Sequence, residues 1–180
     1  GSYTARLTHG DTVLETPVTV HWDPINDYDD EAIAEQQALL AETKSMIDAL
    51  YRRVASLQAM QKQVELRKEL AGAADDEALV EAADALLEQL SEWQRAVTTP
   101  ERETFQDVLN FHPEIDAFLI DLYGQADRAV LGLTDGQRQR LEDLRPQWQD
   151  AIDAWDELVN EDVAAFNAAA GPALTVPAWE

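Results

Sequence analysis

The stretch IAEQQALLAETKSMIDALYRRVASLQAMQKQV, residues 33–64, decides the fold. Two series of apolar residues run through it, and each repeats every seven positions: Ile33, Leu40, Ile47 and Val54, with Leu50, Leu57 and Val64 as companions. Such a repeat puts one apolar seam along a helix that packs against other helices. Polar Gln36, Thr43 and Gln61 occupy some seam positions. The pattern predicts one helix from about Asp29 to Leu70, roughly 60 Å long at 1.5 Å per residue.

A second amphipathic segment is expected from about Asp76 to Val97. The small residues at 71–74 predict a break after the first helix, and Asp75 is the predicted N-cap of the second. Thr98-Thr99-Pro100 ends this helix, and a loop follows over 99–112, with one helical turn near residues 103–108. The apolar residues of the second helix fall on one face: Leu79, Ala83, Leu86, Leu90, Trp93 and Val97.

Two further helices are expected in the second half of the chain. Pro113 is a favoured first residue for the third helix, which Gly132 closes. Thr134 and Gln137 form a capping-box pattern that starts the fourth, and Pro146 predicts a kink or a break near Leu144 within it. Gly171-Pro172 ends that helix. The third face contains Ile115, Phe118, Leu119, Leu122, Ala126 and Val130, and the fourth contains Leu141, Leu144, Trp148, Ile152, Trp155, Val159, Val163 and Phe166.

Residues 3–20 have a different pattern. Polar and apolar positions alternate on both sides of His9-Gly10-Asp11, which is typical of a β-hairpin with a glycine-containing turn. Pro17 indicates an edge strand, because proline has no N–H to donate to a neighbouring strand. An isolated hairpin is marginal in water. This hairpin should therefore pack on the helices, on another chain, or on a sheet that lies outside this sequence.

Together these segments predict a mainly α fold: an antiparallel four-helix up-down bundle with a short N-terminal β-hairpin. The alternative is a long hairpin of the first two helices that dimerises. The expected division is a hairpin and connector at 1–24, a helical bundle at 25–172, and an extended tail at 173–180 in which Val176, Pro177 and Trp179 could dock on the surface. No apolar run reaches the ~20 residues that span a bilayer.

The charge of the chain is strongly negative. Its 36 acidic and 13 basic residues give a net charge of −23. Nucleic acids and anionic lipids bind to Lys/Arg surfaces, so we expect neither as a partner. Many acids, only three lysines and many alanines indicate adaptation to high salt, where a short Debye length screens the self-repulsion of the surface. We therefore expect a halophilic origin.

No residue pattern predicts a catalytic, cofactor or metal site. The histidines, His9, His21 and His112, lie in turns or connectors without metal-ligand spacing. The acidic stretch Asp23–Glu31 lacks the alternating ligands and central glycine of a calcium loop, and is expected to start the first helix. Carboxylate pairs are so frequent that chance explains any glycosidase-like spacing. There is no cysteine, and no GxSxG, P-loop, HExxH or GxGxxG motif.

The tryptophans have two candidate roles. Trp93, Trp148 and Trp155 lie on predicted apolar helix faces and are expected in the core. Trp22 and Trp179 flank the bundle. They could form a two-ring platform for a sugar, although packing of both ends over the core is the simpler interpretation.

Several stretches, taken in order, resemble the C-terminal region of large bacterial exported proteins that carry a sortilin-like, BNR-repeat β-propeller, often labelled glycosyl hydrolase. YTARLT (3–8), TPVTV (16–20) and WDP (22–24) are similar to that family's PGTYTVRLT…QPLTVxxDPR passage. The sequence LNFHP (109–113) is similar to its LNYP/LRFP loop, and LYG (122–124) and DVAAFN (162–167) also match. Two departures are Pro146, inside a helix that is continuous in the family, and Ile25, where the family has arginine.

The resemblance implies a parent protein with a propeller, then an immunoglobulin-like sandwich whose last hairpin is residues 3–20, then this helical region. It implies an exported location: periplasmic, extracellular or cell-surface. It transfers no catalytic residue, since the family's active surface would lie on the propeller. We therefore expect a non-catalytic spacer, docking or dimerisation module whose partners are its own propeller and sandwich domains, another protein chain, or a second copy. The alternatives are a wall of the parent's substrate site and a free-standing helical partner-binding protein.

Overall fold

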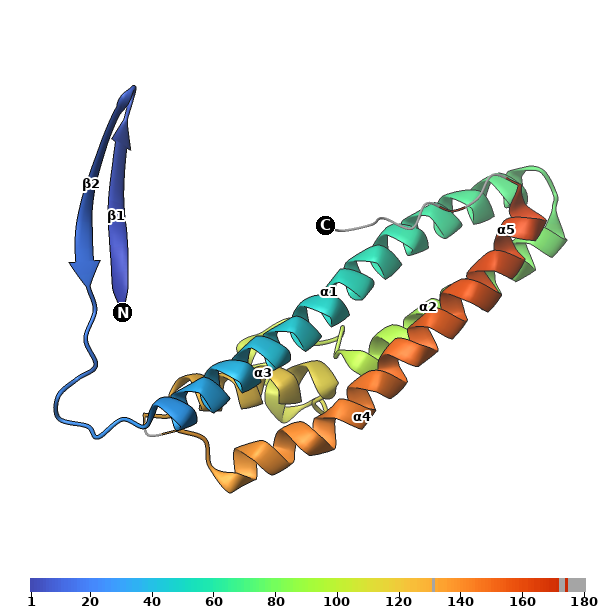
Figure 1. The fold of residues 1–180 in the computed structure, drawn as a ribbon. Helices are drawn as coiled ribbons and strands as arrows, with labels where there is room; N and C mark the ends of the chain where they lie inside the picture. Colours follow the sequence, from blue (N-terminus) through green and yellow to red (C-terminus); the bar gives the residue numbers. More distant parts are fainter. Residues whose placement is uncertain (131, 172–173, 175–180) are drawn as a thin grey trace.

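A computed structural model of the chain describes residues 1–130, 132–171 and 174 (Figure 1). It is mainly helical and begins with a two-stranded antiparallel hairpin, as predicted. No helix among the described residues is long and apolar enough to cross a bilayer. The elements, in order, are β1 (Ser2–His9), β2 (Thr12–Thr19), α1 (Asp30–Ala73), α2 (Glu77–Val97), the 3-10 helix η1 (Phe105–Leu109), α3 (Ile115–Asp127), α4 (Asp135–Leu158), the π-helical segment η2 (Val159–Val163) and α5 (Ala164–Ala170).

The long helix α1 runs the length of the helical body, and α2 and α3 pack along it one after the other (Figure 1). Both are antiparallel to α1. Gln61 Nε2 in the second half of α1 donates to Ser91 Oγ of α2 at 3.3 Å. Near the start of α1, Gln36 Nε2 donates to the carbonyl oxygen of Ala126 at 2.6 Å, at the far end of α3. A buried glutamine thus caps the end of α3, which explains a polar residue in the seam.

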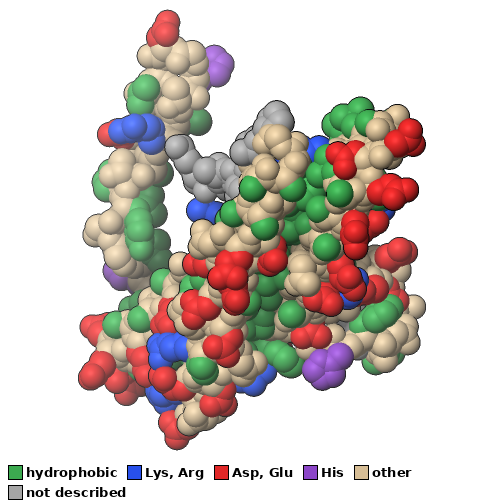
Figure 2. Space-filling model, turned by 90° about the vertical axis from the view of Figure 1, so that its right-hand side faces the viewer, with side chains coloured by type: hydrophobic (Ala, Val, Ile, Leu, Met, Phe, Trp, Pro, Cys, Tyr) green, Lys and Arg blue, Asp and Glu red, His purple; other side chains and the backbone are tan. Residues whose placement is uncertain are grey.

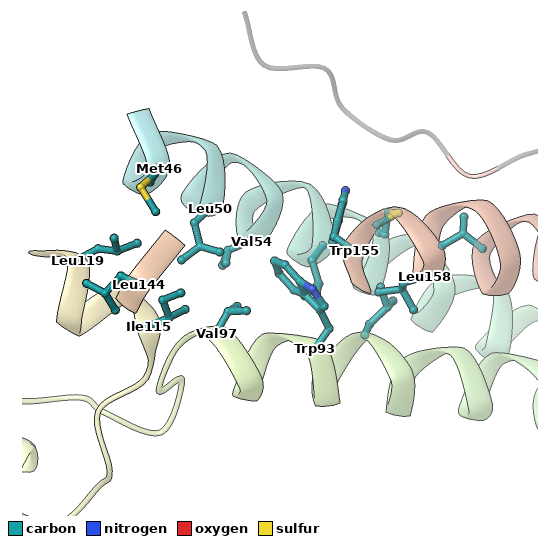
Figure 3. Close-up of a cluster of buried hydrophobic side chains, with 14 of the residues drawn as sticks. Met46, Leu50, Val54, Trp93, Val97, Ile115, Leu119, Leu144, Trp155 and Leu158 are labelled. Atoms are coloured by element: carbon teal, nitrogen blue, oxygen red, sulfur yellow. The ribbon is translucent and has the colours of Figure 1, made fainter. Parts of the chain in front are cut away.

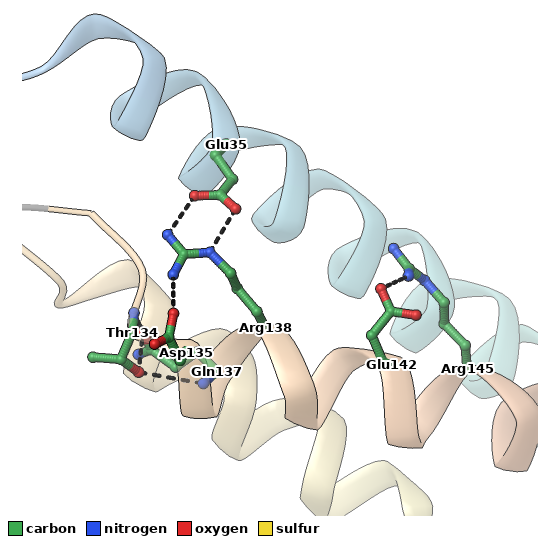
Figure 4. A network of polar contacts seen from close by, with 7 residues as sticks. All are labelled: Glu35, Thr134, Asp135, Gln137, Arg138, Glu142 and Arg145. Carbon is green, nitrogen blue, oxygen red and sulfur yellow. Dashed lines mark hydrogen bonds and ion pairs between the residues drawn. The ribbon is translucent and has the colours of Figure 1, made fainter.

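The helix α4 runs parallel to α1. Glu35 pairs with Arg138 (Figure 4), and Glu42 pairs with Arg145. A step of seven residues along α1 thus matches a step of seven along α4 in the same direction. The predicted up-down order is therefore not confirmed. The connection over residues 98–114 carries the chain onward along α1 instead of reversing it. As a result α3 continues in the direction of α2, and only α4 turns back.

The core follows the seven-residue repeat of α1, but around a different centre from the one predicted. Every position of one heptad series is buried: Gln36, Thr43, Leu50, Leu57, Val64 and Ala71. Leu50 lies among side chains of the other helices in Figure 3. The predicted residues Leu40 and Val54 are also buried, whereas Ile33 and Ile47 are half-buried. The apolar seam is wide because α1 packs against α2, α3 and α4.

Thr43 places a hydroxyl group in this apolar seam. Its side chain is fully buried, and its Oγ1 has no hydrogen-bond partner. A buried hydroxyl without a partner costs about 1–3 kcal/mol. We expect Thr43→Val, which keeps the branched shape, to raise the free energy of unfolding in urea by about 1 kcal/mol. Thr43→Ser, which keeps the hydroxyl, is the control and should not stabilise the protein. A loss of stability in Thr43→Val would contradict this account.

Most helix ends follow the sequence signals, with two corrections. The helix α3 begins at Ile115 and not at Pro113, and it ends at Asp127, before Gly132, so Val130 lies outside it and is exposed. Asp29 caps α1, and Thr134 and Gln137 form the predicted capping box of α4 (Figure 4). The predicted N-cap Asp75 is wrong. Asp76 caps α2 through the N–H of Leu79, and Asp75 lies at φ 56° in the turn. Aspartate tolerates this left-handed conformation better than most residues. Asp75 therefore occupies the turn, and Asp76 caps the helix.

The predicted break at Pro146 is wrong, since α4 continues through it. Pro146 is exposed, as is Glu142, whose carbonyl loses its ladder partner, so water can bond that carbonyl. The irregularity lies later, at η2. Buried Leu158 and Val163 are five residues apart there instead of three or four. The wider turn rotates the helix by about one residue and keeps Val163 and Phe166 in the core.

The two ion pairs between α1 and α4 are bidentate. Arg145 Nε and Nη2 donate to the two oxygens of Glu42 at 2.6 and 2.9 Å, and Arg138 binds Glu35 in the same way. The hydrogen bonds from Arg145 hold the pKa of the Glu42 carboxyl below its ordinary value. Because the folded-state pKa is the lower one, the stabilisation is present above the unfolded-state pKa and is lost as the pH falls through the folded-state pKa.

We therefore expect Glu42→Gln to lower the free energy of unfolding at neutral pH, with the difference from wild type shrinking below about pH 4.5. Urea unfolding between pH 3.5 and 7 measures it. Exposed Glu88 on α2 provides the control, because Glu88→Gln removes the same charge without breaking the bridge between α1 and α4. Equal pH profiles for the two variants would show that the ion pair contributes nothing.

Candidate interaction surface

The hairpin presents one apolar and one polar face. Its register pairs Tyr3 with Val18 and Leu7 with Leu14, so these four side chains share a face. The opposite face carries Thr4, Arg6 and Thr8 across from Pro17, Glu15 and Val13, and an ion pair joins Arg6 to Glu15 at 2.6 Å. This alternation is typical of a sheet with one face packed on a core and the other in water.

The apolar face is uncovered. Tyr3, Leu7, Leu14 and Val18 are 40–65% exposed, and every residue of both strands is exposed. The hairpin projects from the helical body on the connector 20–29, which is exposed except at half-buried Asn26 and Tyr28 (Figures 1 and 2). Within that connector the rings of Trp22 and Tyr28 lie 5.0 Å apart. Of the partners expected for the hairpin, the helices are therefore excluded in this structure.

The turn of the hairpin is set by its sequence. Gly10-Asp11 forms a two-residue loop with Gly10 at φ 56°, and glycine in the first loop position suits a type II′ turn. That turn fixes the register, and the register in turn fixes which side chains share a face. The apolar face is thus determined by the sequence of the hairpin itself.

The hairpin also differs from the helical body in charge. Residues 1–20 contain Arg6, Asp11 and Glu15 and carry a net charge of −1 out of −23 for the chain. Acidic side chains are spread over the helical body in Figure 2. The hairpin is therefore the nearly neutral, apolar surface of an otherwise strongly acidic protein.

The other candidate residues from the sequence are the three histidines and the acidic stretch 23–31. His9, His21 and His112 are exposed and lie on separate segments. Asp23 accepts a hydrogen bond from the N–H of Ile25, and Asp29 from that of Glu31, so both carboxylates serve local turns. Within residues 1–130, 132–171 and 174, no group of three His, Asp or Glu side chains is placed to hold a metal ion.

The core prediction is confirmed for Trp93 and Trp155, which are buried with ring centroids 4.9 Å apart (Figure 3). Trp148 is half-buried against the core, and its Nε1 donates to the carbonyl oxygen of Met46 at 3.1 Å. The prediction that Trp22 packs over the core is wrong, since it is 59% exposed beside Tyr28. Trp179 and the rest of the predicted tail, apart from Leu174, lie outside the described residues. Leu174 is buried, and its N–H donates to Asn167.

One polar groove was not predicted. It lies between α1, the end of α2 and the start of α3, and Tyr51, Arg102 and Asp116 contribute to its wall. The Tyr51 hydroxyl donates to Asp116 at 2.9 Å. Burial, together with the negative charge of Asp116, raises the pKa of Tyr51 to about 12, so the phenol stays protonated at neutral pH. These residues are 65 positions apart, and no local pattern in the sequence connects them.

Three described carboxyl groups have a pKa shifted from its ordinary value. Where the pKa of a described carboxyl is shifted, in Glu35, Glu42 and Asp107, hydrogen bonds move it down. A catalytic acid at neutral pH needs a shift in the other direction. These three carboxyl groups therefore belong to ion pairs and to a helix cap.

No known protein family, curated protein or solved structure matches the chain. Its function must therefore be argued from its own residues.

Proposed function

We propose that this chain is a non-catalytic accessory module that docks, through the apolar face of its hairpin, onto a β-sheet domain of the same polypeptide. The observation that carries the proposal is the uncovered face formed by Tyr3, Leu7, Leu14 and Val18. The helical body has a complete core of its own and makes no use of that face. The body then serves as a spacer or outer docking element beyond the sheet.

Burial of the apolar face of the hairpin would be energetically favourable. Fully burying a large apolar side chain contributes roughly 1.5–3 kcal/mol, and these four are 40–65% exposed, so covering them supplies about 3–7 kcal/mol before the cost of ordering. Two strands alone are marginal in water, whereas a third strand or a packed face makes a sheet stable. Docking would thus stabilise the hairpin as well as fix the helical body to its neighbour.

The setting we propose is the C-terminal end of an exported propeller protein, with the hairpin as the last part of a sandwich domain. This setting rests on the resemblance of residues 3–24 and of the helical motifs to that family. In such a parent, deletion of residues 25–180 should leave substrate turnover unchanged. A large loss of turnover would instead favour a role as a wall of the substrate site.

The reading frame that encodes the chain provides the test. We expect it to encode a β-rich domain before Tyr3. In the longer protein, amide hydrogen exchange of Tyr3, Leu7, Leu14 and Val18 should be at least about tenfold slower than in this chain. If the frame encodes no β-rich domain, or if the hairpin exchanges equally fast in both proteins, the proposal is wrong.

A matched pair of variants locates the docking face. Leu14 and Val13 are neighbours on β2 with opposite orientations, and both are exposed in this chain. In the longer protein, Leu14→Ser should restore fast exchange to the hairpin, whereas Val13→Ser should not. The reverse pattern would place the contact on the face of Arg6 and Glu15.

A further inference from the structure

The two strands of the hairpin differ at their outer edges. In an antiparallel pair, residues that exchange both backbone hydrogen bonds alternate with residues whose N–H and C=O point away from the partner strand. Gly1 and Val20 exchange both bonds, at 2.8 and 2.6 Å. The register from Ser2–Thr19 to His9–Thr12 has no bulge. The outward-pointing residues of β1 are therefore Ser2, Thr4, Arg6 and Thr8.

On β2 the outward-pointing residues are Val13, Glu15, Pro17 and Thr19. Pro17 has no N–H, so the outer edge of β2 lacks a donor in its second half. Proline at this kind of position protects an edge against further pairing. The edge of β1 has no such interruption and offers an N–H and a C=O at each outward position.

We propose that β1 is the strand-accepting edge of the hairpin: a strand of the neighbouring β-sheet domain pairs with residues 2–8, and β2 stays the outer edge of the enlarged sheet. This inference rests on the proposed function and adds which strand the partner meets. Added strands commonly bind in this way, with backbone hydrogen bonds at the edge and side chains packed on alternate positions.

The size and charge of the hairpin favour a β-sheet domain over a second copy of this chain. Eight residues at about 3.3 Å and two strands at about 4.8 Å give a face of roughly 250 Å². Stable interfaces bury about 800 Å² per partner. A second copy would pair hairpin with hairpin only, and it would bring together two helical bodies that carry most of a −23 charge each. A whole sheet domain supplies both the added strand and a larger cover.

Arg6 and Glu15 provide a matched test, because they face each other across the strands and point outward on opposite edges. Arg6→Pro removes a donor from the β1 edge, and Glu15→Pro removes one from the β2 edge. Either change breaks the same Arg6–Glu15 ion pair and spares the hydrogen bonds between β1 and β2. In the longer protein we expect Arg6→Pro to speed hairpin amide exchange by at least about tenfold, and Glu15→Pro to leave it within about twofold of wild type.

Exchange in the unsubstituted longer protein gives a second measurement. The outward amides of Thr4 and Thr8 should be protected relative to this chain, and those of Val13 and Thr19 should not. Equal protection at both edges, or a larger effect of Glu15→Pro, would overturn the inference about β1. If Leu14→Ser still releases the hairpin in that case, the proposed docking stands. If neither Leu14→Ser nor Arg6→Pro has an effect, both proposals fail.

Discussion

Raising the NaCl concentration from about 0.05 M to 1 M should raise the melting temperature of this chain by about 10 °C or more. Nearly all of the net charge of −23 lies outside the hairpin. Acids such as Asp150, Asp153 and Glu157 on α4 are three or four residues apart and exposed, close enough to repel one another. The Debye length falls to about 3 Å at 1 M salt, which is shorter than these separations.

Salt also weakens attractive pairs, so the sign of the effect depends on which interactions dominate. The bidentate pairs Glu35–Arg138 and Glu42–Arg145 are partly exposed and therefore contribute little each. The excess of 36 acids over 13 bases leaves many more like-charge neighbours than ion pairs. Repulsion should win, and stability should rise with salt.

A salt can also stabilise a protein without screening its charges, because ions that are excluded from the protein surface, such as sulfate, strengthen apolar burial. The control must separate this effect from screening. Thermal melts in NaCl and in sodium perchlorate at equal ionic strength serve this purpose, since most of the screening gain should appear by about 0.5 M in both. The triple variant Asp150→Asn, Asp153→Asn, Glu157→Gln should melt higher at low salt and gain less from added salt. No gain in wild type between low and molar salt would contradict both the screening argument and the proposed halophilic origin.

Secondary structure was largely predictable because it depends on local signals. The seven-residue repeat, the box at Thr134 and Gln137, and the glycine turn at Gly10 each act within a few residues. The predicted break at Pro146 and the predicted N-cap Asp75 failed because each depends on more than the local sequence. Whether a proline breaks a helix depends on whether water can reach the freed carbonyl, and the choice between Asp75 and Asp76 depends on the path of the turn.

Topology and sites were less predictable, since they depend on contacts between distant residues. The parallel course of α1 and α4 is fixed by residue pairs 103 positions apart, and the Tyr51–Asp116 contact joins residues 65 apart. Neither leaves a local pattern. The apolar face of the hairpin did leave one, the alternation in residues 3–20, but only the structure shows that the helical body does not cover it.

The centre of the core seam can be tested with two leucines of the same helix. Leu57 is fully buried in α1, whereas Leu66, nine residues later, is 57% exposed. Both sit well inside the helix, so replacement by alanine has the same small effect on helix propensity at each site. The two substitutions therefore differ mainly in the apolar contacts they remove.

Leu57→Ala should cost about 2–5 kcal/mol, because it leaves a cavity where α1 packs into the core. Leu66→Ala should stay within about 0.5 kcal/mol of wild type, as expected for a surface site. For a chain of this length the first loss corresponds to a melting temperature lower by about 5–15 °C. Urea unfolding followed by circular dichroism at 222 nm measures both variants, in 1 M NaCl so that charge repulsion does not obscure the comparison. Similar costs for the two variants would mean that the series Gln36, Thr43, Leu50, Leu57, Val64 and Ala71 is not the centre of the packed face, and the arrangement of α2, α3 and α4 around α1 would have to be revised.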